Sequence, residues 1–172
     1  MSVITVKRIV YILVLMIVVS AGAKFLINSR NIEQYSFPYK EINLGDSFAR
    51  VIEILGDPIS QEKHEVDHIL EELAGKSINV DKLTYKEVSF LVVFEENQSP
   101  YIILINIRDP NFRLPKNIGI GTRKSKVLKV FGNPTNSQSD KLFYMNYEDR
   151  NGIEFTLIND TVSQIQMSLL ND

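Results

Sequence analysis

The chain has 172 residues, of which 44% are hydrophobic and 23% charged, and its 19 basic and 21 acidic side chains leave a net charge of −2. This balanced composition excludes a disordered acidic tail, a collagen-like fibre and a membrane protein with many spans. The absence of cysteine excludes a disulfide scaffold, a thiolate zinc site, a cysteine nucleophile and a lipid anchor on an N-terminal cysteine.

The first 27 residues predict a membrane-targeting segment. Lys7 and Arg8 precede an uncharged stretch, residues 9–23, that is rich in Ile, Val and Leu. Because basic residues stay on the cytoplasmic side, we expect the rest of the chain outside the cytoplasm. Two outcomes remain open. The small residues that end at Ala23 match a signal-peptide cleavage site, whereas residues 9–27 are long enough for a retained single-pass anchor.

The polar residues 28–40 predict a linker between the membrane and the folded part. The remainder is long enough for one compact domain or two half-domains. We divide the chain into a membrane segment (1–27), a linker (28–40), a first repeat (41–109) and a second repeat (110–172).

The division into repeats is based on two similar stretches, which begin at residues 42 and 118, an offset of 76 positions. In each stretch a glycine turn precedes a short amphipathic helix, and a second glycine and a proline end it. We interpret the match as a duplication; the alternative is two unrelated helices with common end signals. The identical pairs are Ile42/Ile118, Gly45/Gly121, Val51/Val127, Gly56/Gly132 and Pro58/Pro134.

Apolar and polar residues alternate after each helix, which predicts strands. We expect strands at 88–94 and 101–107 in the first repeat, and at 142–147, 153–158 and 162–169 in the second. An insertion in the first repeat, from Glu62 to Ala74, has a helical pattern. The predicted fold class is α+β: two tandem repeats, each a short helix or helix pair packed on an antiparallel sheet, after an N-terminal membrane helix.

These features resemble the β-lactamase-inhibitor-protein fold, and a single repeat resembles the small lipoprotein of the outer-membrane β-barrel assembly machine. The resemblance covers residues 42–169. It implies a non-enzymatic binder or assembly factor of the bacterial cell envelope that presents a sheet face to another protein. The matching residues are Gly45, Val51, Gly56, Asp57 and Pro58, with Gly121, Val127, Gly132, Asn133 and Pro134.

One motif suggests catalysis. His64, Glu65 and His68 form an H-E-x-x-H pattern, in which two histidines four apart on a helix bind zinc and the glutamate activates water. The chain has only two histidines, so a third imidazole ligand is missing. On a helix over 62–74 both histidines lie opposite the apolar stripe. We therefore favour an exposed acidic helix, and keep a zinc-dependent hydrolase as the alternative function.

One face of the predicted sheet in the second repeat combines aromatic and methionine side chains with amides and hydroxyls, as protein-binding surfaces do. A register shifted by one residue would instead bury the three largest of these side chains. The candidate partner-binding residues are Phe143, Met145, Tyr147, Thr156, Gln164 and Gln166.

We therefore expect a membrane-tethered protein-binding module, such as an envelope assembly factor, an inhibitor or an immunity-type protein. Its expected partners are another envelope protein and the membrane, through residues 9–27, and not nucleic acid. We expect neither enzymatic activity nor a cofactor. The expected location is the inner membrane, with the domain outside the cytoplasm, or a secreted or periplasmic location if the chain is cleaved after Ala23.

Overall fold

The structure is a computed structural model that describes residues 36–64, 79–95 and 97–169. The predicted membrane segment lies outside these ranges, as do Glu65 and His68 of the H-E-x-x-H motif. Within the described ranges, no helix has the length and apolar character needed to span a membrane.

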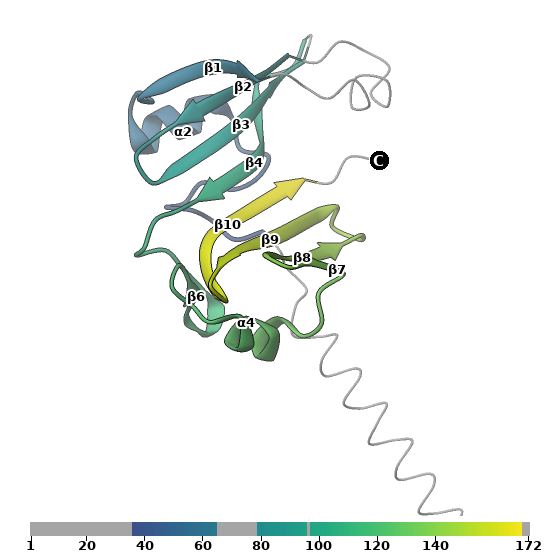
Figure 1. The fold of residues 1–172 in the computed structure, drawn as a ribbon. Helices are drawn as coiled ribbons and strands as arrows, with labels where there is room; N and C mark the ends of the chain where they lie inside the picture. The colour runs from purple at the N-terminus through teal and green to yellow at the C-terminus, as the bar shows by residue number, and fades with distance from the viewer. Residues whose placement is uncertain (1–35, 65–78, 96, 170–172) are drawn as a thin grey trace, which may run out of the picture. The chain divides into compact units, whose positions relative to one another are not determined.

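Eight strands form one antiparallel sheet in the order β1-β2-β3-β4-β10-β9-β8-β7 (Figure 1). Each half of the chain supplies four neighbouring strands, and the two halves meet where β4 pairs with β10. The strands are β1 (Ser60–His64), β2 (Asn79–Thr84), β3 (Val88–Phe94), β4 (Tyr101–Ile107), β7 (Asn136–Gln138), β8 (Lys141–Asn146), β9 (Asn151–Ile158) and β10 (Thr161–Leu169).

Two short helices, α2 (Phe48–Leu55) and α4 (Lys124–Phe131), precede the strands of their respective halves. Both end at a glycine in the left-handed region, Gly56 with a φ of 73° and Gly132 with a φ of 77°. The backbone N–H of each glycine donates to the carbonyl four residues earlier, at 2.9 Å. A small hairpin of β5 (Arg113–Leu114) and β6 (Ile118–Gly119), joined by the 3₁₀ turn η1 (Pro115–Asn117), connects the halves.

The turns before the two helices lie 76 residues apart in the sequence and make equivalent contacts with the sheet. Gly45 N–H donates to the carbonyl of Ile102 and Gly121 N–H to that of Val162, both at 2.8 Å. Both glycines have positive φ, 84° and 86°, which a residue with a Cβ rarely adopts. In each half this hydrogen bond fixes the start of the helix to a strand of the sheet.

The core lies between the helices and one face of the sheet. Phe131 of α4 packs its ring 5.1 Å from that of Phe155, and Phe48 of α2 lies 6.3 Å from Phe94. Burying these side chains removes large apolar areas from water, at about 25 cal/mol per Å². Phe155 is fully buried, whereas Phe48 and Phe94 are half-buried. The fully buried large side chains also include Tyr39, Ile42, Leu83, Phe90, Ile102, Ile105, Ile107, Ile118, Leu142, Tyr144 and Ile153.

The predicted fold class was wrong. The chain does not form two helix-on-sheet repeats, because the eight strands make a single large antiparallel sheet on which only two short helices are described. The physical reason is the edge of each half: β4 and β10 would each expose unpaired N–H and C=O groups. Pairing Ile165 with Ile107 and Met167 with Ile105 satisfies both edges and buries all four side chains completely.

The predicted helix from Glu62 to Ala74 was also wrong in its described part. Glu62 and His64 belong to strand β1, where they pair with Lys82 and Val80 of β2. This short strand is exposed at four of its five positions. Ser60–His64 is therefore an exposed edge strand. At these positions, pairing with β2 overrides the helical pattern that the sequence predicts.

The folded part includes the end of the predicted linker. Tyr39 is 2% exposed, and its hydroxyl donates to the Asp109 carboxylate at 3.0 Å. Its ring centroid lies 5.7 Å from that of Phe112, just before β5. The chain therefore enters the folded part beside the hairpin that connects the two halves.

Candidate functional site

The face of the sheet opposite α2 and α4 is the candidate site, and we call it the open face. No helix in the described ranges covers it, and its side chains in β8, β9 and β10 are half-exposed where their neighbours on the core face are buried. Glu154 is one such residue, between the buried Ile153 and Phe155.

Paired residues on antiparallel strands share a face, so the register identifies the side chains that line up across the open face. The row through the middle crosses all eight strands and is polar apart from one aromatic ring. From β7 to β1 it contains Asn136, Phe143, Glu154, Gln166, Asn106, Ser89, Thr84 and Ser60.

The structure brings five of the six sequence-predicted partner-binding residues together on this face. Phe143 and Met145 lie on β8, Thr156 on β9, and Gln164 and Gln166 on β10, all half-exposed. Thr156 pairs directly with Gln164. The alternative register, which would bury Phe143 and Met145, is therefore not adopted.

The sixth predicted residue, Tyr147, follows the end of β8 and is 72% exposed. It lies in the turn that leads to β9, beyond the paired residues of the two strands. Tyr147 is therefore not part of the central row of the open face.

Phe143 and Gly152 together shape a hollow in the open face. A Cβ at position 152 would lie 3.2 Å from the Cε2 and Cζ atoms of Phe143, so the aromatic ring lies over the glycine. This packing covers backbone that a glycine leaves bare. Beside it is a hollow of about 270 Å³, lined by Asn136, Ser137, Gln138, Lys141, Phe143, Glu154, Gln166 and Ser168.

Two polar contacts link strands of the open face, one of them between residues that line this hollow. Lys141 Nζ lies 3.0 Å from Glu154 Oε1, joining β8 to β9. The Arg108 Nε–H donates to Gln164 Oε1 at 3.0 Å, joining the end of β4 to β10. These contacts restrict the rotamers of Glu154 and Gln164, so less conformational entropy is lost when a partner binds.

Asn106 lies next to Gln166 at the centre of the open face. Its Oδ1 is buried and has no hydrogen-bond partner. A buried acceptor without a donor costs free energy, about 1–3 kcal/mol. A hydrogen-bond donor from a bound molecule, or an ordered water, would recover that cost.

Asn106, Arg108 and Asn136 were missed by the sequence predictions. Asn106 and Arg108 join the site only because β4 pairs with β10 across the two halves. The alternation of Leu104, Asn106 and Arg108 was the available signal, since a period of two places all three on one face. Asn136 comes from β7, a three-residue strand too short to predict from its pattern.

Of the residues of the zinc alternative, the structure describes only His64. His64 ends β1 and is exposed, while Glu65 and His68 lie outside the described ranges. Among the residues that the structure describes, no group of three or more His, Cys, Asp or Glu side chains could hold a metal ion.

Comparisons with known proteins identify no family. No family model matches the sequence, and no curated protein matches it significantly. One similar solved structure, determined at 1.5 Å resolution, is an extracellular protein containing a SCP domain from Bacillus anthracis str. Ames. The match has a TM-score of 0.39 and 10% identity, and covers 73% of this chain and 43% of that one. A likeness this weak carries no argument about fold or function.

Proposed function

We propose that this protein is a non-enzymatic protein-binding module that works outside the cytoplasm and contacts a cell-envelope protein through the open face. The single observation that carries the proposal is the clustering of Phe143 and Met145 with the amides and hydroxyls of β9 and β10 on a face that no described helix covers.

The size and chemistry of the open face fit a protein better than a small molecule. The hollow beside Phe143, at about 270 Å³, is just below the usual range of ligand pockets, about 300–1,000 Å³. The polar row, in contrast, extends over every strand of the sheet. An aromatic anchor surrounded by amides and hydroxyls is typical of a non-obligate protein interface.

The proposed location follows from the sequence. Lys7 and Arg8 before the apolar residues 9–27 favour export of everything that follows. Whether residues 1–27 stay as an anchor or are removed after Ala23, the open face is outside the cytoplasm. The predicted resemblance to the β-lactamase-inhibitor-protein fold implies the same use of a sheet face.

Site-specific crosslinking tests the proposal. A photoreactive residue replaces Gln166 on the open face, and a matched one replaces Ala49, which is exposed on α2. We expect one discrete envelope-protein adduct from position 166 and none from position 49 when the full chain is illuminated in its own membranes. Adducts from both positions, or from neither, would contradict the assignment of the face.

Affinity for the partner identified in this way gives the second measurement. The double variant Phe143→Ala, Met145→Ala should bind more than about tenfold more weakly, since truncating interface anchors costs about 2 kcal/mol or more. The matched control is Ile59→Ala, which truncates a 74% exposed hydrophobic side chain just before β1. Equal affinities of the double variant and the unmodified chain would contradict the proposal.

A further inference from the structure

A cluster of basic residues lies on α4, at its N-cap and in η1, and we call it the basic patch: Lys116, Arg123, Lys124, Lys126 and Lys129. Lys124 is half-exposed and the other four are exposed. Within the described ranges none of them forms an ion pair with a carboxylate; Lys126 Nζ instead donates to the carbonyl of Asn117 at 3.1 Å. This concentration of positive charge contrasts with a net charge of −2 for the chain.

The equivalent helix in the first half shows that the fold does not need these charges. At the offset of 76 positions, Glu53 of α2 stands where α4 has Lys129, and Phe48 stands where α4 has Lys124. The one cation of α2, Arg50, is neutralised, with a nitrogen 2.8 Å from Glu53 and another 3.5 Å from Glu41. The same helix geometry therefore forms with balanced charge.

Three of the five charges in the basic patch act against α4 itself. Arg123 occupies the N-cap position without a capping hydrogen bond, and Lys124 and Lys126 follow in the first turn, which has no acidic residue. Positive charge at a helix N-terminus is unfavourable because the helix dipole is positive there. Stability of α4 therefore does not explain these three charges, whereas attraction to an external anion would.

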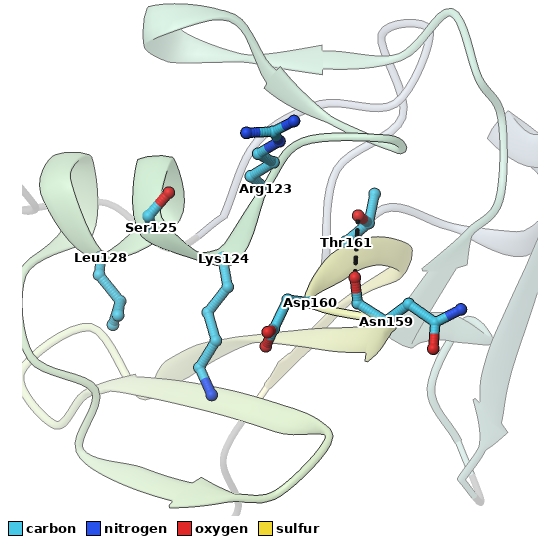
Figure 2. Close-up of a pocket in the computed structure, with 7 residues that line it drawn as sticks. All are labelled: Arg123, Lys124, Ser125, Leu128, Asn159, Asp160 and Thr161. Carbon is cyan, nitrogen blue, oxygen red and sulfur yellow. Dashed lines mark hydrogen bonds between the residues drawn. The ribbon is translucent and has the colours of Figure 1, made fainter.

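The side chains of the patch spread outward and do not converge on one point. Figure 2 shows Arg123 and Lys124 extending in opposite directions from the start of α4, with Asp160 on the Lys124 side. All three line a wide hollow of about 600 Å³. A small anion needs converging donors, and a carboxylate in the same hollow opposes it. An extended surface of many negative charges matches this arrangement better.

The chain enters the folded part beside the patch. Tyr39 packs against Phe112 at the start of the β5–β6 hairpin, and the turn of that hairpin contains Lys116 and the Lys126 acceptor Asn117. The twelve residue-to-residue steps from position 27 to position 39 span at most about 40 Å when the chain is fully extended. If residues 9–27 remain in the membrane, a linker of this length allows the basic patch to reach the bilayer surface.

We propose that the basic patch binds the anionic phospholipid head groups of the membrane in which the chain is anchored. This inference depends on the membrane tether of the proposed function, and not on the open face. Each Lys or Arg near an anionic bilayer contributes about fivefold to binding, and the attraction falls off within about 10 Å in 0.1 M salt. The tether supplies the high local concentration that makes such contacts effective.

The test uses a fluorescent reporter on the full chain. Because the protein has no cysteine, Ser125→Cys in α4 and Ala49→Cys at the equivalent position of α2 each provide a single site for an environment-sensitive dye. The labelled chains are reconstituted into vesicles of phosphatidylcholine alone or with phosphatidylglycerol. We expect a blue shift of the dye at position 125 only in the anionic vesicles, no shift at position 49, and loss of the effect in about 1 M salt.

Matched triple variants distinguish the patch from total charge. Replacing Lys124, Lys126 and Lys129 by Gln should reduce the contacting fraction by about tenfold or more. Replacing the exposed Lys63, Lys82 and Lys86 by Gln removes the same charge from the first half. This variant should leave the contacting fraction unchanged. Equal shifts in neutral and anionic vesicles, or equal loss in both triple variants, would overturn the proposal.

A separate measurement tests the membrane tether independently of the basic patch. Extraction of the vesicles with alkaline carbonate reports whether residues 9–27 hold the chain in the bilayer. A retained chain without an anionic-lipid shift overturns the patch alone. A released chain overturns the tether, and with it the proposal that the basic patch binds the membrane in which the chain is anchored. Crosslinking at Gln166 continues to report the open face in either case.

Discussion

The buried pair of Tyr39 and Asp109 shows how one side chain can make stability depend on pH. Asp109 is 4% exposed, and its carboxylate accepts from the Tyr39 hydroxyl at 3.0 Å and from the Asn111 N–H at 2.8 Å. Burial by itself raises the pKa of Asp109, but these hydrogen bonds and the charge of Lys40 outweigh it and hold the pKa below its ordinary value. Burial and the same carboxylate raise the pKa of Tyr39.

The substitution Asp109→Asn should therefore lower the free energy of unfolding by about 1–3 kcal/mol at pH 7. The pKa of Asp109 is lower in the folded than in the unfolded state, so its charge stabilises the fold above about pH 4. That contribution is lost as pH falls through the folded-state pKa. Urea unfolding as a function of pH should show the deficit of the variant shrinking in acid.

The control for this prediction is Asp140→Asn, which changes an exposed side chain. We expect it to alter the free energy of unfolding by less than about 0.5 kcal/mol at neutral pH. A deficit of Asp109→Asn that stays constant from neutral pH into acid would mean that lost packing, and not charge, is responsible.

At the scale of elements, the two helices start differently although the turns before them match. Ser47 Oγ accepts from the Arg50 N–H at 3.3 Å and caps α2, whereas Arg123 gives α4 no side-chain cap. Asp46 and Thr122 lie one residue before these N-cap positions and do not cap the helices. Each accepts instead from a backbone N–H in the preceding turn, that of Asn43 at 2.8 Å and that of Gly119 at 3.0 Å.

This difference predicts unequal effects of equivalent substitutions. Ser47→Ala should lower the free energy of unfolding by about 1 kcal/mol, because it leaves an N–H of the first turn without its acceptor. Arg123→Ala removes no cap and relieves an unfavourable charge at the N-terminus of α4, so it should be neutral or slightly stabilising. Thermal denaturation of the two variants in parallel measures both effects, and a larger loss for Arg123→Ala would contradict the role of the cap.

The elements that the sequence predicts well are those with a strong local pattern. Two predicted strands, 88–94 and 101–107, coincide with β3 and β4, and 162–169 differs from β10 by one residue. Gly56 and Gly132 end their helices as predicted. The edge strands β1 and β7 were missed, because they bury almost nothing and so carry no apolar alternation.

At the scale of the whole molecule, the pairing of β4 with β10 could not be read from the sequence. The alternation of apolar and polar residues shows which face of a strand is buried. It does not show which other strand will be its hydrogen-bonded neighbour. Both strands are apolar on the core face, and either edge was compatible with a sheet confined to one half. The candidate site was therefore predicted only within the second half, and Asn106 and Arg108 were missed.

The continuous sheet predicts that the two halves unfold as one cooperative unit. Ile165 is fully buried in β10, where it pairs with Ile107 of the first half and with Phe155 of the second. Ile165→Ala leaves a cavity at the junction and should lower the free energy of unfolding by about 2–5 kcal/mol. Because the strands share one hydrogen-bonded ladder, amides of β3 should lose as much hydrogen-exchange protection as amides of β9.

The control is Ile158→Ala, at a site 64% exposed. It should change neither the free energy of unfolding nor the hydrogen-exchange protection. Loss confined to β8, β9 and β10 would mean that the halves are stable independently and that the junction merely joins them.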